Sequence, residues 1–434
     1  MRVLVISHGH PSLSIGGAEV ASYNLHCGIN ELPESESIYL ARVGHPVARH
    51  KETPFLSLRQ AEGEILFHTQ EYDHFRLSNR DIASIERDFT RFVADARPDV
   101  VHFHHFLGLG VECIHAVRRA LPNVPIVVTL HEYLSICHHH GQMVKTKRNA
   151  LCQRASPAEC SMCFPEISAG EFLKREMFLK TLFAEVDCFV SPSDFLIDRY
   201  VAWGLPAEKM RMIENGQKVD AIAAPRPVPK VGGKRNRFGF FGQITEFKGV
   251  HVLLDAVTRV PDDIWGDDSA LLIFGGNLEN QPEAFQKNFK DLLERAGRRA
   301  RLYGSYKAPE MPALMREIDW LVVPSIWWEN SPMVIQESYA HGRPVIASNI
   351  GGMAEKVVHG RTGLHFRAGS VEDLVDRLVE AIKGPDLWQR LRNNLPTPLS
   401  HFDAARLHRN LYSELLAQRG GSVQPTQLKT ARIA

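Results

Sequence analysis

The sequence lacks the features that would place it in a bilayer, on nucleic acid or among disulfide-stabilised proteins. Its 434 residues contain no apolar run long enough to cross a membrane and no convincing signal peptide at the start. The formal net charge is only +1, which argues against nucleic acid as a partner. The seven cysteines are odd in number, which argues against a disulfide framework. We therefore expect a cytoplasmic protein.

Two motifs of nucleotide-using enzymes are missing as well. No Gly-x-Gly-x-x-Gly follows the first apolar strand, which disfavours a dehydrogenase. No Asp-x-Asp loop for a divalent cation is present, so we expect no cofactor to be required for catalysis. The composition is that of an ordinary globular protein, 44% hydrophobic and 23% charged, and the length suits two domains.

Apolar strands alternate with helical patterns along the whole chain, beginning with a strand over residues 1–7. This alternation predicts an α/β protein with doubly wound parallel sheets. A proline-rich segment over residues 222–233 separates two such series and marks a domain boundary. We expect an N-terminal Rossmann-like domain over residues 1–222, a C-terminal one over 223–402, a final helix over 403–418 and a disordered tail over 419–434.

The most informative stretch covers residues 319–366. It contains an apolar strand over 320–323, a loop, a helix, a second strand over 344–347 and a glycine turn. Serine caps the free N–H groups at a helix start, and proline fits the first helical position. Such a helix end attracts anions. We therefore expect a phosphate to bind at Asn330, Ser331, Pro332, Met333 and Val334.

Two carboxylates bracket this anion site, Glu329 in the loop and Glu337 within the helix. A carboxylate suits a pair of sugar or ribose hydroxyls, because it accepts two charge-strengthened hydrogen bonds. The run PSIWWENSPMVIQESYAHGRPVIASNIGGMAE resembles the signature of glycosyltransferase family 4, whose members have the GT-B fold. The resemblance implies two Rossmann-like domains facing each other across a cleft. It also implies that Glu329 holds hydroxyls of the transferred sugar and that Glu337 holds the ribose.

Other donor-site residues follow from the same resemblance. Gly16 and Gly17 form a glycine turn after the first strand, which in the family faces the donor phosphates. Lys248 matches a lysine that grips the donor diphosphate, whereas Gln243 stands where the family has arginine. His131 corresponds to a histidine beside the transferred sugar. We expect Glu329, His131 and Lys248 to be the catalytic residues. Weaker candidates for acceptor contacts are His8, His10, His104, His105 and Glu132.

A cysteine-bearing insertion over residues 137–163 departs from the plain family core. Its pattern is Cys-x14-Cys-x7-Cys-x2-Cys, formed by Cys137, Cys152, Cys160 and Cys163. Four thiolates suit a tetrahedral structural zinc site with no open position for chemistry. The alternatives are an iron–sulfur cluster and four unrelated reduced thiols, since the spacing matches no standard zinc module.

The resemblance implies a retaining glycosyltransferase that moves a sugar from a nucleoside diphosphate sugar to an acceptor hydroxyl, in glycan, polysaccharide or glycolipid synthesis. Rival functions are a sugar-nucleotide epimerase or hydrolase of the same fold, and a non-catalytic scaffold that binds sugar nucleotides. The acceptor is expected to be a glycan or a lipid-linked molecule. An amphipathic helix over residues 171–183, with Lys174, Arg175 and Lys180 on its basic face, could then lie on the inner face of the membrane. The alternative is a helix that packs its apolar stripe inward and keeps its basic face in water.

Overall fold

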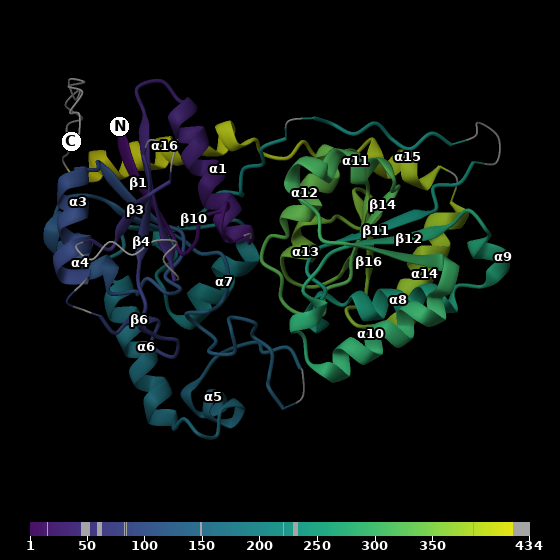
Figure 1. Ribbon diagram of the computed structural model, residues 1–434, viewed down its shortest axis with the longest axis horizontal. Coiled ribbons are helices and arrows are strands. Elements are labelled where there is room, and N and C mark those ends of the chain that lie inside the picture. The colour runs from purple at the N-terminus through teal and green to yellow at the C-terminus, as the bar shows by residue number, and fades with distance from the viewer. Residues whose placement is uncertain are drawn as a thin grey trace.

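The computed structural model describes residues 1–14, 16–44, 53–58, 63–81, 83, 85–147, 150–219, 221–228, 233–384 and 386–419. It has two α/β halves that lie side by side, each built around its own sheet (Figure 1). The prediction of two doubly wound parallel sheets is confirmed. Residues 420–434 of the expected disordered tail lie outside the described residues.

The N-terminal sheet has the strand order β10-β9-β8-β7-β1-β2-β4-β3, and every pair is parallel except β3 with β4. Alternate residues of β1 enter two different cores, because successive side chains of a strand point to opposite faces: Leu4 and Ile6 on one face, Val3 and Val5 on the other. The strands are β1 (Arg2–Ser7), β2 (Glu36–Val43), β3 (Phe55–Ser57), β4 (Glu64–His68), β7 (Val100–Phe103), β8 (Ile126–Thr129), β9 (Cys188–Ser191) and β10 (Met210–Met212).

Helices cover both faces of this sheet, and a two-stranded ribbon of β5 (Tyr72–Asp73) and β6 (Ser78–Asn79) lies apart from it. A turn of π-helix over Ile85–Phe89 leads directly into α3. The helices of this half are α1 (Gly17–Glu31), α3 (Thr90–Ala96), α4 (Cys113–Ala120), α5 (Pro157–Cys163), α6 (Ala169–Phe183) and α7 (Asp194–Trp203).

The C-terminal sheet is wholly parallel and has the order β13-β12-β11-β14-β15-β16. Its central strands read as continuous apolar runs because helices bury both faces. The predicted strand over residues 320–323 is confirmed as β14, and the one over 344–347 is shifted by one residue. The strands are β11 (Arg237–Phe241), β12 (Ala270–Phe274), β13 (Ala300–Gly304), β14 (Trp320–Val323), β15 (Val345–Ser348) and β16 (Gly363–Phe366).

The helices of this half are α8 (Val250–Arg259), α9 (Asp262–Trp265), α10 (Glu283–Ala296), α11 (Met311–Arg316), α12 (Met333–Ala340), α13 (Gly351–Lys356), α14 (Val371–Lys383) and α15 (Leu387–Arg392). The expected glycine turn at Gly351-Gly352 is wrong, because both residues already belong to α13.

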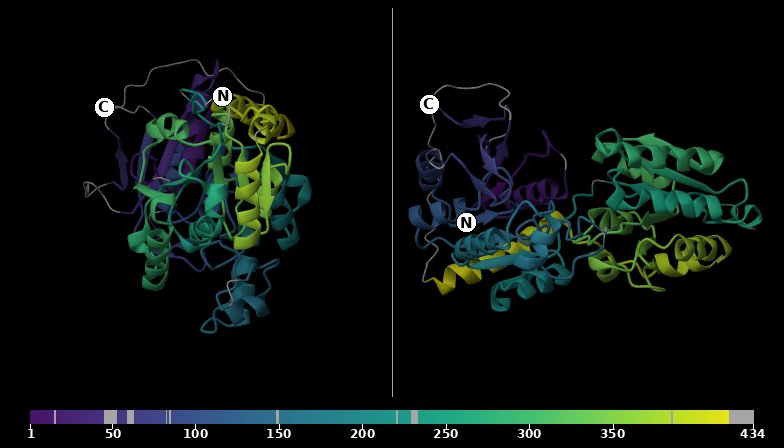
Figure 2. Two further views of the ribbon diagram at one scale, coloured as in Figure 1. Left: turned by 90° about the vertical axis from the view of Figure 1, so that its right-hand side faces the viewer. Right: turned by 90° about the horizontal axis from the view of Figure 1, so that it is seen from below.

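The last helix, α16 (His401–Gln418), returns to the N-terminal half and lies against α1 (Figures 1 and 2). The two helices approach closely at Gly28, where a Cβ atom would stand 2.5 Å from the carbonyl oxygen of His401. Only glycine leaves room for that approach. The chain therefore connects the two halves twice, once between β10 and β11 and once on its return to α16.

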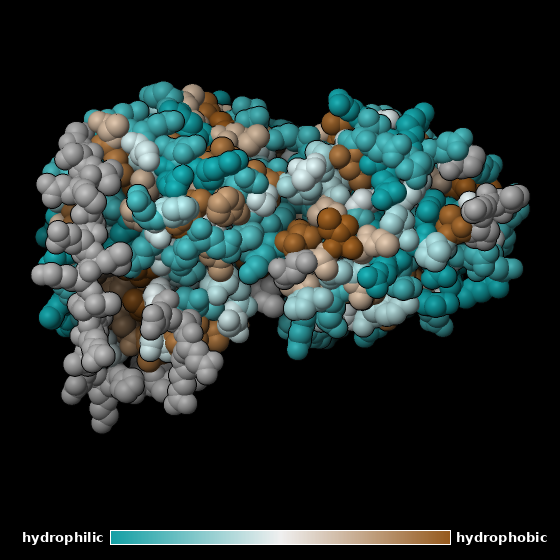
Figure 3. Space-filling view, turned by 90° about the horizontal axis from the view of Figure 1, so that it is seen from above, coloured by the Kyte–Doolittle hydropathy of each residue, from teal (hydrophilic) through white to brown (hydrophobic). Residues whose placement is uncertain are grey.

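The strand orders fix where a ligand can bind. In each sheet the order reverses at one point, between β1 and β7 in the N-terminal half and between β11 and β14 in the C-terminal half. Doubly wound sheets bind ligands at the carboxyl ends of the strands beside such a switch point. Among the described residues, no helix is both long and apolar enough to cross a bilayer, and the face seen from above is largely hydrophilic (Figure 3).

Candidate functional site

The loops that leave the two switch points meet each other. Gly17 opens α1 after β1, as the sequence predicts, and Met333 opens α12 after β14. A Cβ atom built on Gly17 would stand 3.8 Å from the sulfur of Met333. The amino-terminal ends of α1 and α12 therefore face each other across the junction of the two halves, and both favour an anion between them.

Lys248 is placed by a short 3₁₀ turn, Glu246–Lys248, that follows β11. The hydroxyl of Thr245 accepts a hydrogen bond from the backbone N–H of Lys248 and so caps the turn. Gly249 ends it at a φ of 69°, and a Cβ atom there would lie 1.9 Å from the carbonyl oxygen of Pro324. The glycine thus lets the lysine turn pack against the loop that carries Glu329.

Glu329 and Lys248 form an ion pair with 2.6 Å between Oε1 and Nζ. The same carboxylate oxygen accepts hydrogen bonds from the hydroxyl of Ser325 at 2.8 Å and from the indole N–H of Trp327 at 2.9 Å. Burial raises the pKa of Glu329, but the charge of Lys248 and the hydrogen bonds that the carboxylate accepts outweigh it and hold the pKa below 4.5. The site therefore holds a fixed, ionised carboxylate beside a cation.

Glu337 differs from Glu329 although both are acidic and largely buried. Among the described residues, its carboxylate has neither a hydrogen bond nor an ion pair. Burial alone raises the pKa of Glu337 to about 7. The residue lies on the second turn of α12, and its acceptor oxygens are free for a ligand.

The predicted start of α12 is wrong in detail. The helix begins at Met333, Pro332 occupies the preceding cap position, and no side chain caps the end. The hydroxyl of Ser331 is buried without a hydrogen-bond partner instead of capping the helix. The N–H groups of Met333 and Val334 are consequently left for a ligand, because no side chain caps this end and the carbonyl of Pro332 accepts only from the N–H of Ile335.

Gln243 and Asn330, two of the expected donor residues, differ from each other in exposure and in contacts. Gln243 is exposed in the loop after β11. Asn330 connects the two halves: its amide donates to the carbonyl of His131 at 3.0 Å and its oxygen accepts from the hydroxyl of Ser193 at 2.5 Å. Ser193 also caps α7, where its hydroxyl accepts from the N–H of Leu196.

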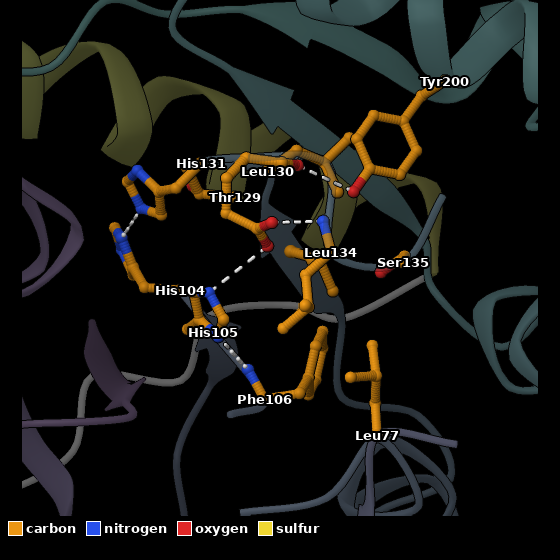
Figure 4. Close-up of a pocket in the computed structure, with 12 residues that line it drawn as sticks. Leu77, His104, His105, Phe106, Thr129, Leu130, His131, Leu134, Ser135 and Tyr200 are labelled. Atoms are coloured by element: carbon orange, nitrogen blue, oxygen red, sulfur yellow. Dashed lines mark hydrogen bonds and ion pairs between the residues drawn. The ribbon is translucent and has the colours of Figure 1, made fainter. Parts of the chain in front are cut away.

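His131 follows β8, and its Nε2 atom lies 2.9 Å from Nδ1 of His104, which follows β7. Figure 4 shows the two rings facing each other at the rim of a small pocket. Burial, together with the nearby His105 and His8, lowers the pKa of His131 to about 3. The imidazole is therefore neutral at ordinary pH, and it can donate or accept a hydrogen bond but carries no charge.

Two histidine–glutamate pairs continue this edge of the N-terminal sheet. His8 lies 3.3 Å from Glu19 of α1, and His105 lies 3.3 Å from Glu132. The rings of His8 and His105 are 4.2 Å apart. Burial raises the pKa of Glu19, but its hydrogen bond and charge interaction with His8 outweigh this and lower the pKa to about 2. Polar side chains thus line the N-terminal side opposite Glu329.

Contacts between the halves include several residues that the sequence alone did not indicate. Glu355 of α13 accepts from the backbone N–H groups of Asp194 and Phe195 at the start of α7. Lys356 forms an ion pair with Glu214. Glu355 stands at the end of the recognised signature, which was the only sequence signal that could have drawn attention to it.

The four cysteines of the insertion line one cavity. Among the described residues, however, no three His, Cys, Asp or Glu side chains are placed to hold a metal ion as they stand. Burial raises the pKa of Cys137 to about 11, and it also raises the pKa values of Cys152 and Cys160. Without a cation among them, Cys137, Cys152 and Cys160 are protonated at neutral pH.

The helix predicted over residues 171–183 forms as α6 and packs its apolar side inward, with Phe172, Leu179 and Phe183 buried. The sequence placed Arg175 on a solvated basic face, which is wrong, because the residue is only 3% exposed. Leu173 and Met177 are exposed instead. Arg175 is buried because its guanidinium donates hydrogen bonds to three backbone carbonyls, at 2.5 to 2.7 Å.

Two family models match the chain. Residues 68–216 match a glycosyl transferase 4-like domain, and residues 235–384 match the glycosyl transferases of group 1. The first model covers most of the N-terminal half beyond β4, and the second covers the sheet that carries Lys248 and Glu329.

Individual proteins agree with these matches. An uncharacterised glycosyltransferase of Methanocaldococcus jannaschii is 33% identical over 159 residues, which are 36% of this chain and only 41% of that protein. The glycogen synthase of Mycobacterium tuberculosis is 26% identical over 335 residues, 76% of this chain and 71% of that protein. The crystal structure of Anabaena HepE in complex with UDP and glucose has a TM-score of 0.65 and 16% identity, and the match covers 95% of this chain and all of that one. The structural likeness shows a shared fold.

Proposed function

The chain belongs to the GT-B glycosyltransferase superfamily, and we propose that it transfers a sugar from a nucleoside diphosphate sugar to an acceptor hydroxyl with retention of configuration. The observation that supports this best is the buried ion pair of Lys248 and Glu329 beside the uncapped start of α12. A cation, free N–H groups and a carboxylate then lie within one site, and a diphosphate sugar needs all three.

The main chemical task is to stabilise negative charge on the leaving diphosphate as the sugar–phosphate bond breaks. Lys248 supplies a positive charge, and the first N–H groups of α12 supply donors that no side chain uses. The opposing start of α1 at Gly17 adds a second positive helix end. These groups act without a catalytic metal ion.

In this proposal each glutamate holds a different part of the donor. Glu329 accepts hydrogen bonds from hydroxyls of the transferred sugar, while its bonds to Ser325 and Trp327 keep it in place. Glu337, whose carboxylate has no other partner in the described chain, accepts from the ribose hydroxyls. That Anabaena HepE was crystallised with UDP supports a nucleoside diphosphate as the leaving group.

The acceptor binds on the N-terminal side. His131, neutral because its pKa is about 3, would offer a hydrogen bond to the transferred sugar without repelling the developing positive charge on it. The carboxylates of Glu19 and Glu132, each paired with a histidine, would bind acceptor hydroxyls. The departing phosphate oxygen would take the proton of the attacking hydroxyl, as the family resemblance implies.

A lipid-linked acceptor would bring the protein to a membrane surface. Leu173 and Met177 of α6 are 48% and 61% exposed, and Lys174 lies between them. We propose that these side chains contact anionic lipid. Flotation with phosphatidylglycerol vesicles would test this: the Leu173→Ser/Met177→Ser variant should bind less, and no binding of the unaltered chain would refute the contact.

A panel of nucleoside diphosphates and their sugars, measured by thermal shift, tests the donor site first. A ligand at 100 times its Kd stabilises the folded state by about 2.7 kcal/mol, so the correct donor should stand out. Turnover with candidate acceptors, and the anomeric configuration of the product by NMR, test the reaction. No shift with any donor would refute the proposal, and sugar release without an acceptor would indicate a hydrolase.

A further inference from the structure

Four of the seven cysteines lie around one cavity although they come from separate stretches of chain. Cys137 follows the loop after β8, Cys152 lies fifteen residues later in sequence, and Cys160 and Cys163 belong to α5. The remaining cysteines are distant from this cavity: Cys27 lies on α1, and Cys113 and Cys188 are buried in the two cores of the N-terminal half.

The backbone holds the four positions in relation to one another. The N–H of Cys152 donates to the carbonyl of Met143 at 2.7 Å, beside a β-bridge between Val144 and Leu151. The hydroxyl of Thr146 donates to the carbonyl of Cys163 at 2.8 Å. The described residues between Cys137 and α5, 138–147 and 150–156, are therefore folded back onto the helix.

A buried cation lies next to these thiols. Arg175 of α6 is 3% exposed, and its guanidinium donates to the carbonyls of Phe75, Leu134 and Ser135. Within the described chain it has no carboxylate partner, and Cys137 and Cys160 are the ionisable groups that most favour its charge. A buried guanidinium without a counter-charge is costly. Negatively charged thiolates in the neighbouring cavity would supply that counter-charge.

We propose that Cys137, Cys152, Cys160 and Cys163 bind one zinc ion, and that Arg175 balances part of the negative charge of the resulting site. Four thiolates around Zn²⁺ carry a net charge of −2, and zinc prefers such soft ligands in tetrahedral geometry. The thiols line the cavity without converging, so they rotate toward the ion when it binds. Four protein ligands leave no position for a substrate, which makes the ion structural.

The cysteine segment reaches the donor site at two points. The indole N–H of Trp328, next to Glu329, donates to the carbonyl of Cys152 at 3.0 Å. The ring of His139 lies 6.4 Å from that of Phe247, next to Lys248. The zinc ion therefore fixes the segment against which both members of the Lys248–Glu329 pair are positioned. This second step rests on the proposed function, whereas zinc binding itself does not.

Metal analysis of the full-length protein, purified without chelator and with zinc in the medium, tests the site. We expect about one zinc ion per chain, its loss in Cys160→Ser/Cys163→Ser, and its retention in Cys27→Ser, which alters a cysteine outside the cavity. Cobalt exchanged into the site should give intense thiolate-to-metal absorption. A folded, metal-free protein that takes up neither ion would overturn the proposal, and so would equal zinc content in both variants.

The cysteine variant could fail to fold, so the coupling is measured on the unaltered chain. Zinc is removed with a chelator and then restored, with circular dichroism as the check on folding and nucleoside diphosphate titration as the readout. We expect removal to weaken binding severalfold and Trp328→Phe to reduce that dependence. Unchanged affinity would overturn the coupling alone. If the protein bound no nucleoside diphosphate with zinc present, the proposed function would be refuted. Whether the four cysteines bind zinc would still be decided by the metal content.

Discussion

Lys248 and Glu329 neutralise each other, with 2.6 Å between Nζ and Oε1, although they lie 81 residues apart in sequence. They follow β11 and β14, the two strands that flank the switch point of the C-terminal sheet. The cation assigned to the diphosphate and the carboxylate assigned to the sugar thus form one ion pair. Changing either residue alters the charge of the other's surroundings.

Glu329→Gln should abolish most turnover while leaving diphosphate affinity equal or higher. The substitution removes the sugar contact, yet it frees Lys248 from its counter-charge. We expect kcat to fall by about a hundredfold or more, the range seen when one precisely placed polar group is removed. Steady-state kinetics and titration with the nucleoside diphosphate would measure the two effects. Glu372→Gln, on the exposed side of α14, is the control, and wild-type turnover in Glu329→Gln would refute its role.

Lys248→Ala should weaken nucleoside diphosphate binding by about tenfold or more, because a direct charge contact with phosphate is lost; tenfold corresponds to about 1.4 kcal/mol. The variant should also be less stable, by about 1–3 kcal/mol, since Glu329 would keep its burial without its cation. Calorimetric titration and denaturant unfolding test both. Lys287→Ala, an exposed lysine on α10, is the matched control. Unaltered diphosphate affinity would rule out the phosphate contact.

Glu337 should make the unliganded protein less stable as pH rises. Its folded-state pKa of about 7 lies above its ordinary value of 4.5 because the carboxyl is buried. The unfolded chain therefore releases this proton first, and the favourable contribution present below pH 4.5 is lost as pH rises to about 7. Unfolding free energies between pH 5 and pH 7.5 should show this slope, and Glu337→Gln should flatten it. An identical slope in the variant would contradict the assignment.

Donor binding should release protons near pH 6.5 if Glu337 holds the ribose. Accepting two hydroxyl hydrogen bonds favours the ionised carboxylate and lowers its pKa. Calorimetric titration in buffers of different ionisation enthalpy would give the number of protons released. This number should approach one as the pH falls from 7.5 toward 5, and it should be smaller in Glu337→Gln. Proton release that the substitution leaves intact would place the titrating group elsewhere.

Two glycine substitutions should separate folding from function. Gly249→Ala should destabilise the protein, because φ is 69° and the Cβ atom would lie 1.9 Å from the carbonyl oxygen of Pro324. Gly17→Ala should fold normally, since the nearest atom to its Cβ is the Met333 sulfur at 3.8 Å. It should nonetheless lower turnover, because the methyl group would occupy the space where α1 approaches the diphosphate. Thermal unfolding and kinetics measure the two effects, and full activity in Gly17→Ala would exclude that approach.

Some of the site could be predicted because its signals are local. Each of these signals lies within one short segment: the glycine pair Gly16-Gly17, the apolar strand over residues 320–323, and the spacing of Glu329 from Glu337. Such signals report backbone freedom and strand or helix preference, which depend on neighbours in sequence. The same reasoning was wrong about Ser331 and Arg175, since a cap or a buried guanidinium depends on which groups the fold brings near.

The alternation of strand and helix patterns was enough to predict two α/β halves with parallel sheets, because strand and helix periodicity are properties of contiguous chain. Three contacts could be found only in the folded protein: Lys248 pairs with Glu329, Asn330 joins the halves through His131 and Ser193, and Trp328 contacts the cysteine segment. Those contacts join residues from 81 to 199 positions apart. Their geometry follows from how the strands are ordered and how the halves pack, and no short-range pattern encodes it.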